Sequence, residues 1–590
     1  NELGVLESSD VQVAARLGAL GGEPDQRVLL AVALAVKALR GGSVCLDLSA
    51  VADATPEATG VGWPDPSEWL AAVQASPLVA ASVLHLEGPL LYLDRYWREE
   101  GLIAARLRER VTAAPPPVDE AVLLAGAQRI FPEGYAEQRA VSVAAARRWT
   151  ALITGGPGTG KTTAVAGLIA LLAEQAAATG ATRPLRVALT APTGKAAARL
   201  QEAVAAAAAR LPGDDRARLA ALPTTAASTL HRLLGSRPGT RTRFRHDRDN
   251  RLPHDVVVVD ETSMVSLTMM ARLVEALRPD ARLVLVGDPD QLSSVEAGAV
   301  LADLVAGYAA LDPDAVGALR TSHRFGAQIG ALAVAVRDGD ADAALAVLLA
   351  GGAEVTRLDP ADPLAVAEVR EVALGAALEL RRAAAAGDPA AAIAALDRHR
   401  LLCAHRDGPV GAGHWNRQVE RWLTETSGVP VGAAWGREWY AGRPLLVTAN
   451  DYGLGLFNGD TGVAIAADPG RPRRSGRGRA RPDAPALRAA VATAGEPTLL
   501  ATSRLADVET MHALTIHKSQ GGQADEVTVV LPDEDSHLLT RELLYTAITR
   551  AQSRVRILGS EEALRLSIGR PAQRASGLRA RLAEEGGAAR

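Results

Sequence analysis

Residues 155–163 form a glycine-rich turn, Gly-Gly-Pro-Gly-Thr-Gly-Lys-Thr-Thr. The apolar run 151–153 precedes it, and an alanine-rich stretch of helical character follows. In this strand–loop–helix order, backbone N–H groups and a helix amino terminus face one polyphosphate. Lys161 is expected to reach the β- and γ-phosphates, and the Thr162 hydroxyl to hold Mg²⁺. The residues expected to contact the nucleotide here are Gly155, Gly156, Gly158, Thr159, Gly160, Lys161, Thr162 and Thr163.

Acidic and polar residues follow two further apolar runs. The run 256–259 ends in Asp260-Glu261, and a buried parallel strand delivers such residues to the phosphate-binding edge of its sheet. Asp260 is expected to hold Mg²⁺, directly or through water, and Glu261 to orient and deprotonate the attacking water. Gln291, after the run 283–286, is placed to sense the γ-phosphate, and Arg324 to stabilise transition-state charge.

Only four of the 64 basic residues are lysine, namely Lys37, Lys161, Lys195 and Lys518. A lysine that remains in an arginine-dominated chain indicates a place that requires a compact ammonium. Lys195 follows Thr193-Gly194 at the end of an apolar run, and Lys518 lies in the polar run 515–521. Amides, hydroxyls and an ammonium suit a phosphodiester, although an ordinary strand-to-helix turn would also explain the first of these loops.

Two other segments have the composition of a nucleic-acid contact. Residues 228–232 combine hydroxyl, imidazole and guanidinium groups, although a simple helix cap explains them equally. Residues 236–253 contain six arginines and Phe244, one of only four phenylalanines. We interpret this stretch as a basic β-hairpin whose Phe244 stacks on a base; a solvated charged loop is the alternative.

Composition limits the classes of protein that fit. A chain of 590 residues must hold several domains, and its net charge of −4 restricts any nucleic-acid site to a local groove. No uncharged apolar run of 18 residues and no signal-peptide pattern is present, so we expect neither a membrane span nor secretion. The two cysteines are far apart and lack CxxC spacing, which indicates a reducing, cytoplasmic setting without zinc or an iron–sulfur cluster.

The patterning divides the chain into three parts. Residues 1–115 contain helical periodicities and two short strands near 84–93, and end in an Ala-Ala-Pro-Pro-Pro linker; a structural domain and a partner-docking platform both fit them. Residues 116–325 alternate strands and helices. Residues 326–590 begin as an alanine-rich, largely helical stretch, include β-rich residues near 430–510 with an arginine-rich loop at 470–481, and end in the runs 513–521 and 544–551.

Together these motifs resemble superfamily 1 helicases, and most closely the RecD subunits of RecBCD-type complexes. The resemblance covers about 120–570, with 155–163, 191–200, 228–235, 259–261, 287–288, 294–298, 455–460, 515–521 and 545–551 in the family's order. It implies an α/β fold of two RecA-like lobes, 116–325 and 326–590, with a small hairpin insert at 236–253 and an SH3-like barrel insert at about 430–510. Residues 1–115 would form the partner-docking domain.

The resemblance also implies functions for individual residues. Gln138 would read adenine, Gly521 would contact the nucleotide, and Arg550 would act on ATP with the residues above. The residues that look like DNA contacts are Thr193, Lys195, Thr229, His231, Phe244, Thr515, His517 and Lys518. Gly522-Gln523 stands where the family usually has Ser-Glu, so we expect a changed nucleotide contact and retained activity.

The activity that the resemblance implies is an ATP- and Mg²⁺-dependent 5′→3′ motor on single-stranded DNA that unwinds duplex ends. The short first module, with its 42–49 and 91–97 motifs, favours a subunit of a heterotrimer with RecB-like and RecC-like chains over a stand-alone RecD-like helicase. We see no separate acidic cluster for a nuclease, so DNA cutting would belong to a partner. A DNA clamp that does not translocate and an RNA helicase remain alternatives.

Overall fold

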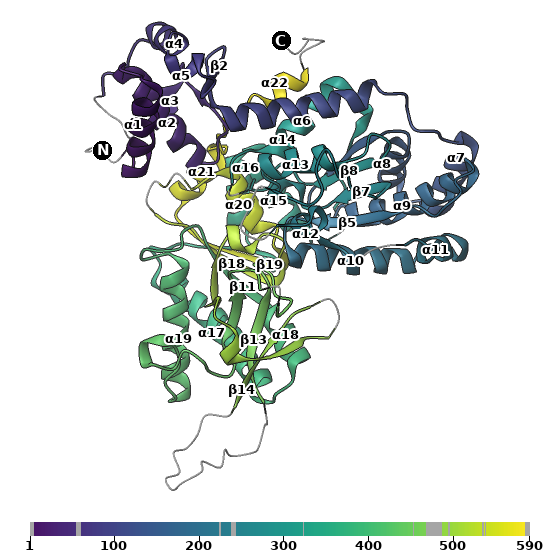
Figure 1. Ribbon diagram of the computed structural model, residues 1–590. Coiled ribbons are helices and arrows are strands. Elements are labelled where there is room, and N and C mark those ends of the chain that lie inside the picture. Colours follow the sequence, from purple (N-terminus) through teal and green to yellow (C-terminus); the bar gives the residue numbers. More distant parts are fainter. Residues whose placement is uncertain are drawn as a thin grey trace.

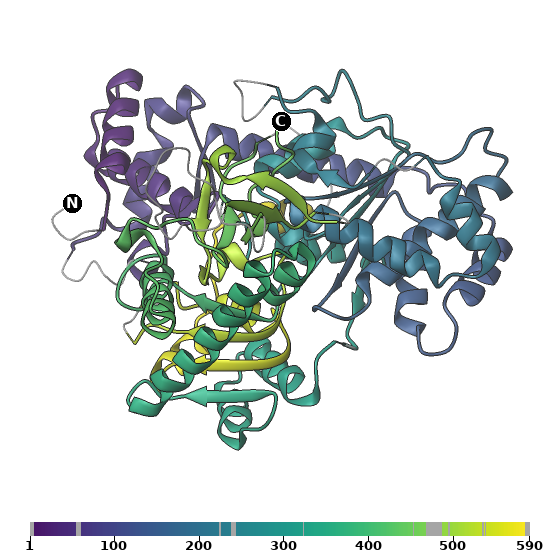
Figure 2. The same ribbon diagram turned by 90° about the horizontal axis from the view of Figure 1, so that it is seen from below.

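A computed structural model describes residues 5–583, except 55–60, 224–225, 238–242, 295, 323, 452, 468–485, 494–495, 534–535 and 537. Figures 1 and 2 show a blue-to-teal unit and a green-to-yellow unit side by side, with the purple amino-terminal region against the first. In the described part of the chain, no helix has the length and apolarity needed to cross a bilayer.

The first unit is built on a six-stranded sheet with strand order β6-β5-β7-β8-β4-β9, in which every pair is parallel. Its strands are β4 (Thr150–Gly155), β5 (Val187–Ala191), β6 (Ser228–Thr229), β7 (Val256–Val259), β8 (Arg282–Gly287) and β9 (Val316–Leu319). Successive residues of β7 enter opposite cores, Val257 and Val259 on one face and Val256 and Val258 on the other. Both faces are therefore covered, as a wholly parallel sheet requires.

Helices cover both faces of this sheet. The core that contains Val256 and Val258 is closed by α7 (Glu120–Ile130), α8 (Ala136–Ala146), α9 (Lys161–Ala178), α10 (Gly194–Ala209) and α11 (Gly213–Ala220). The opposite core is closed by α6 (Asp94–Thr112), α12 (Leu230–Leu234), α13 (Leu267–Ala276) and α14 (Val300–Leu311). The expected alternation of strands and helices is confirmed.

The second unit contains another wholly parallel sheet, of order β10-β19-β18-β11-β17. Its strands are β10 (Val355–Leu358), β11 (His399–Cys403), β17 (Ala513–Thr515), β18 (Ala524–Val530) and β19 (Ala551–Leu558). The helices of this unit are α15 (Ala327–Asp338), α16 (Ala341–Ala350), α17 (Pro363–Ala385), α18 (Pro389–Leu396), α19 (Ala412–Ser427), α20 (Arg541–Ile548) and α21 (Glu561–Gly569). The expected α/β class with two parallel sheets is confirmed.

Two of these strands were not predicted from the sequence. Residues 326–430 are largely helical, as expected, but β10 and β11 also lie within them, and β11 pairs with a strand on each side. Both are runs of four or five residues, too short to show a period of their own between alanine-rich helices.

The expected β-rich insert is a five-stranded antiparallel sheet of order β15-β14-β13-β12-β16. Its strands are β12 (Pro444–Val447), β13 (Thr461–Ala466), β14 (Leu487–Val491), β15 (Thr498–Ala501) and β16 (Val508–Thr510). Asn458-Gly459 forms a turn directly before β13, and Gly459 has the left-handed φ of +94° that such a turn needs. The arginine-rich loop at 470–481 lies outside the described residues.

The amino-terminal region packs as a small helical module. It contains α1 (Ser8–Gly21), α2 (Gln26–Arg40), α3 (Val51–Ala54), α4 (Pro66–Gln74) and α5 (Pro77–Ala80). A three-stranded sheet of order β1-β3-β2 joins them, made of β1 (Leu46–Asp47), β2 (Leu84–Glu87) and β3 (Leu90–Leu93). The two strands expected near 84–93 are β2 and β3, and they pair antiparallel around Gly88.

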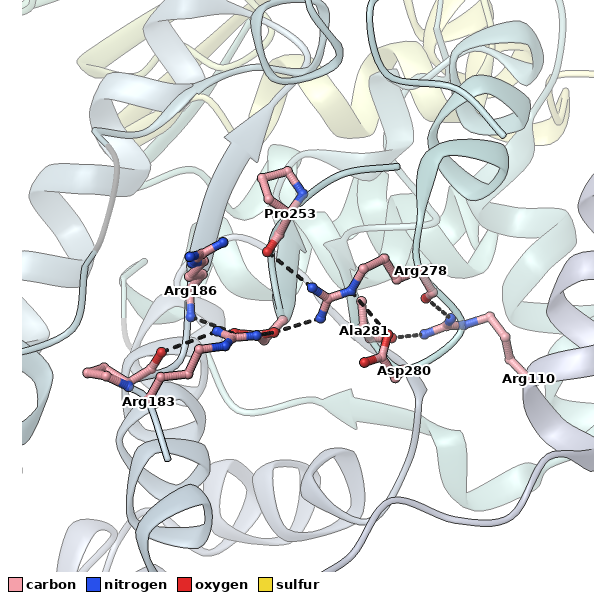
Figure 3. Close-up of polar contacts among 9 residues, drawn as sticks. Arg110, Arg183, Arg186, Pro253, Arg278, Asp280 and Ala281 are labelled. Carbon is pink, nitrogen blue, oxygen red and sulfur yellow. Dashed lines mark hydrogen bonds and ion pairs between the residues drawn. The ribbon is translucent and has the colours of Figure 1, made fainter. Parts of the chain in front are cut away.

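Helix α6 joins this module to the first sheet and is tied down at its carboxyl end. Arg110 donates hydrogen bonds to the Thr150 hydroxyl at 2.7 Å and the Trp149 carbonyl at 2.6 Å, and also reaches the carbonyls of Ala281 and Arg278. Figure 3 shows the contacts of Arg110 with the carbonyls of Ala281 and Arg278. Beside them, the side chains of Arg278 and Arg183 and the backbone N–H of Arg186 donate to one carboxylate.

This carboxylate belongs to Asp255, one residue before β7. Although burial opposes ionisation, the hydrogen bonds from Arg183, Arg186 and Arg278 leave the pKa of Asp255 well below its usual range. A charged Asp255 thus holds the amino-terminal ends of the strands together, opposite the edge where the phosphate loop lies.

The carboxyl-terminal segment returns to the first unit. After α21 the chain runs beside the amino-terminal module, where the Val44 N–H donates to the Ala575 carbonyl at 2.9 Å and the Ser576 hydroxyl donates to Glu100 at 2.8 Å. Helix α22 (Leu578–Ala583) then packs on α14 and α6. Residues 476 and 531 positions apart therefore stabilise one interface.

Candidate nucleotide and nucleic-acid sites

The phosphate loop connects β4 to α9 and is shaped by glycines that cannot be replaced. Gly158 and Gly160 have φ values of +81° and +88°, in the region that favours glycine. A Cβ at Gly158 would lie 2.2 Å from the Cβ of Arg324, and one at Gly160 would lie 2.7 Å from the amide nitrogen of Gln138. Lys161 begins α9, and its ammonium donates to the carbonyls of Gly155 and Gly156 at 2.6 and 3.0 Å.

Gln138 lies behind this loop. It is 3% exposed on α8, and its amide nitrogen donates to the Thr159 carbonyl at 2.8 Å. The structure therefore shows Gln138 bracing the loop. Its adenine contact stays a prediction, for which the amide oxygen and the second N–H of the amide remain.

The carboxyl ends of β7 and β8 place acids beside the loop, as the strand pattern predicts. Burial and the neighbouring Glu261 raise the pKa of Asp260 to about 6, while Lys161 opposes the rise. Burial also raises the pKa of Asp288, against the effect of Lys161. Glu261 follows with a φ of +50°, a strained value for a non-glycine residue. Such strain is common where a side chain must be aimed at a reaction.

These residues fit Mg·ATP. Lys161 and the amino terminus of α9 supply positive charge for a triphosphate, and bare glycines leave room for it. Desolvation disfavours the ionised form of the Asp260 carboxyl, and a bound divalent ion would offset that cost. Thr162 and Asp260 would hold Mg²⁺, which would neutralise phosphate charge when bound.

The two sheets meet across this loop through a buried hydrogen-bonded chain. Arg550, 4% exposed after α20, donates to the Gln291 side-chain oxygen at 2.9 Å. Gln291 in turn donates to Asp288 at 3.0 Å, and the Tyr545 hydroxyl donates to the same carboxylate at 3.0 Å. A second-unit arginine and tyrosine thus contact first-unit residues at the phosphate edge.

Arg324 lies over the loop on the segment after β9, against Gly158. With its amide oxygen facing Arg324, Gln523 accepts hydrogen bonds at 2.8 Å from Nη1 and 3.1 Å from Nη2. The unusual Gln523 therefore contacts the arginine that lies against Gly158 of the loop.

The loop after β5 also lies between the units. The Thr193 hydroxyl caps α10 by accepting from the Ala196 N–H at 3.2 Å, and Lys195 lies 3.3 Å from the Thr461 hydroxyl of β13. Burial, with the nearby arginines 199 and 400, lowers the pKa of Lys195 to about 7. Arg199, one turn further along α10, donates to the Gly521 carbonyl at 2.6 Å.

The segment after β6 agrees only in part with expectation. Thr229 caps α12 by accepting from the Arg232 N–H, and His231 lies 6.0 Å from the Phe244 ring. Phe244 is only 6% exposed and belongs to the first-unit core, which corrects the idea of a ring offered freely for stacking. The bridge between Ser236 and Phe244 is antiparallel, as in a hairpin, while 238–242 lie outside the described residues.

The loop after β17 contains the remaining expected DNA contacts. Lys518 is exposed and pairs with Glu509 at 2.7 Å, and its N–H donates to the Thr515 hydroxyl at 3.3 Å. Burial lowers the pKa of both His517 and His231. Both rings are therefore neutral at physiological pH and suit hydrogen bonding to a strand better than ion pairing.

Three residues of the site were not assigned a function from sequence: Asp288, Tyr545 and Arg199. Asp288 directly follows an apolar strand, which is the same signal that marked Asp260. Tyr545 and Arg199 lie inside helices that carry other motif residues, so their position facing the opposite unit needed the fold.

Changing Tyr545 to phenylalanine is expected to lower the free energy of unfolding by about 1–3 kcal/mol, because buried Asp288 loses a donor. The melting temperature should fall and the KM for ATP should rise. Tyr440→Phe is the matched control, since it removes another buried hydroxyl that contacts Glu420 and His512. That control should lose stability with an unchanged KM; the same KM change in both variants would contradict the assignment.

Three family models and a solved structure match parts of this chain. Family models described as "AAA domain", "UvrD-like helicase C-terminal domain" and "RecBCD enzyme subunit RecD, N-terminal domain" match residues 137–297, 510–558 and 2–94. A solved Pif1 helicase from Candida albicans aligns over 73% of this chain and 96% of its own at 14% identity, with a TM-score of 0.37.

Curated relatives are far more similar. "RecBCD enzyme subunit RecD" of Mycolicibacterium smegmatis is 58% identical over 99% of this chain and 98% of its own length. The protein of that name in Mycobacterium tuberculosis is 57% identical over 99% and 96%. "ATP-dependent RecD2 DNA helicase" of Deinococcus radiodurans is 30% identical over 84% and 59%. Given these identities over nearly the full length of the chain, the chain belongs to the RecD family of RecBCD enzyme subunits.

Proposed function

We propose that this chain is an ATP-driven motor that moves 5′→3′ along single-stranded DNA and unwinds duplex ends. The observation that carries the proposal is the chain Arg550–Gln291–Asp288–Tyr545, which couples the second unit to the phosphate loop of the first. A site shared by two units can convert ATP binding and hydrolysis into relative movement.

Individual residues have defined functions in this proposal. Lys161 and the loop amides would bind the phosphates, and Thr162 with Asp260 would hold Mg²⁺. Glu261 takes the proton of the attacking water, and Arg324 and Arg550 stabilise the charge that develops on the transferring phosphoryl group. Gln291 reports the γ-phosphate, because it already bonds Arg550 of the other unit.

The nucleic-acid path would cross both units. The loops with Thr193, Lys195, Thr229 and His231 follow β5 and β6, and the loop with Thr515, His517 and Lys518 follows β17. The antiparallel sheet lies against the first of these, because Lys195 reaches Thr461. Relatives named as RecBCD subunits support assembly with RecB-like and RecC-like chains, to which DNA cutting would belong.

An unwinding assay on tailed duplexes tests the proposal. A 5′-tailed duplex should be opened with ATP and Mg²⁺, whereas a duplex with only a 3′ tail should not. Opening of the 3′-tailed substrate alone would refute the polarity. ATP hydrolysis without separation of either substrate would favour the clamp, and equal stimulation by RNA and DNA would remove the DNA assignment. Co-purification with RecB-like and RecC-like chains tests the assembly.

A further inference from the structure

An open groove of about 1360 Å³ is lined by three separate parts of the chain, and we call it the three-walled groove. Leu39, Arg95 and Tyr96 line it from the amino-terminal region, and Asn450, Phe457 and Asn458 line it from the antiparallel-sheet region. The first unit supplies the third wall, from α12 to α13. Small-molecule pockets are roughly 300–1,000 Å³, so the groove suits a polymer segment better.

The lining has the chemistry of a single-strand site. Arg95, Arg232 and Arg237 line the groove, against one acidic residue, Glu296. The partly exposed side chains of Tyr96 and Phe457 also line it, beside the buried Phe244, in a chain that is only 3% aromatic. Arginine with aromatic faces is the combination that binds the backbone and stacks the bases of a single strand.

Arg95 and Tyr96 are held firmly at this wall. Arg95 donates to the Thr268 hydroxyl of α13 at 2.8 Å, and Thr268 donates to Glu99 of α6 at 2.7 Å. The Arg95 guanidinium lies 5.5 Å from the Tyr96 ring centroid, with half of its side chain exposed. Because Arg110 anchors the other end of α6, this wall is a fixed part of the first unit.

The groove is continuous with the loops assigned to DNA. His231, after β6, is one of its lining residues. Phe457 reaches the loop after β5, where a Cβ at Gly194 would lie 2.7 Å from the Phe457 Cβ. A strand on those loops therefore has a charged and aromatic channel leading toward α6.

We propose that Arg95 and Tyr96 form a further single-stranded DNA site, in which Arg95 contacts a phosphate and Tyr96 stacks on a base. The amino-terminal module then contacts the strand that the motor moves, besides any partner that it docks. This inference rests on the proposed function, because it needs DNA on the loops after β5 and β6.

Binding of fluorescent oligo(dT) to the full chain, measured by anisotropy, tests the site. One oligonucleotide should be short enough to occupy the motor loops alone, and the other several times longer. Tyr96→Ala should weaken binding of the long oligonucleotide at least about fivefold and leave the short one unchanged. Arg95→Ala should reduce the slope of log K against log salt by about 0.7. The matched control is Arg98→Ala, on the same helix and paired with Asp94, which should behave as wild type.

The outcomes separate the two proposals. Wild-type affinity and salt slope in both variants, with a wild-type chain that binds DNA and hydrolyses ATP, would overturn this site alone. Equal losses on both oligonucleotides would also overturn it. A wild-type chain that neither binds DNA nor is stimulated by it would refute the proposed function instead. If Arg95→Ala fails to fold, Arg95→Gln keeps a donor for Thr268 while removing the charge. Unchanged DNA binding with lost co-purification of a partner would assign the groove to a protein segment.

Discussion

Replacing Lys161 with glutamine should reduce DNA-stimulated ATP hydrolysis by at least about 100-fold, the scale of removing one preorganised group from a transition state. The Lys161 ammonium lies at the first residue of α9, where it donates to the carbonyls of Gly155 and Gly156. Glutamine retains a donor of similar length but loses the charge that the β- and γ-phosphates require. Steady-state ATPase measurements with saturating oligonucleotide give the result directly.

The fold should survive this change. Lys161 donates to carbonyls of its own loop, and although its charge also favours the ionised forms of Asp260 and Asp288, those carboxyls can take up a proton when the charge is lost. Melting temperature and single-strand affinity without nucleotide should match wild type. The Lys37→Gln variant, in α2, is the control for losing one of the four lysines and should hydrolyse ATP normally. An unchanged rate of ATP hydrolysis in Lys161→Gln would contradict the proposed function.

The second large effect is expected at Arg550. Arg550→Ala should lower kcat for ATP by about 10³-fold, at the lower end of what an arginine supplies to phosphoryl transfer. The guanidinium is buried between the units, where it donates to Gln291 and to the Thr546 and Gly522 carbonyls. Because it acts mainly on charge that develops during transfer, KM for ATP should change far less than kcat.

Arg550→Lys separates charge from geometry. Arg550 donates to Gln291, Thr546 and Gly522 from three separate nitrogens, and the single nitrogen of a lysine cannot reproduce that geometry. We therefore expect Arg550→Lys to recover only a small part of the lost rate. Arg565→Ala, which removes an exposed arginine of α21 paired with Asp342 and Glu561, is the matched control and should keep full activity. A rise in KM at constant kcat would instead identify Arg550 as a ground-state binding residue.

Much of the nucleotide site could be predicted from the chain alone, because parallel strands bring their following residues to one edge. The turn 155–163, the acids after β7 and the loop after β5 each follow a short apolar run. Local spacing was sufficient there, since each strand delivers its own next residues and the motifs are contiguous. Strands β10 and β11 were not predicted, because four or five residues between alanine-rich helices show no detectable hydrophobic period.

Contacts between distant segments depended on the tertiary structure. Composition marked Phe244 as a stacking residue, but packing decided that its ring is 6% exposed. The link from Arg550 through Gln291 to Asp288 and the approach of Gln523 to Arg324 join residues up to 259 positions apart. Arg95 and the other residues that line the three-walled groove also come from distant segments of the chain. The sequence by itself determined which chemical groups follow each strand; the packing of the two sheets and α6 decided which of them face each other, because side-chain contacts across units have no local signature.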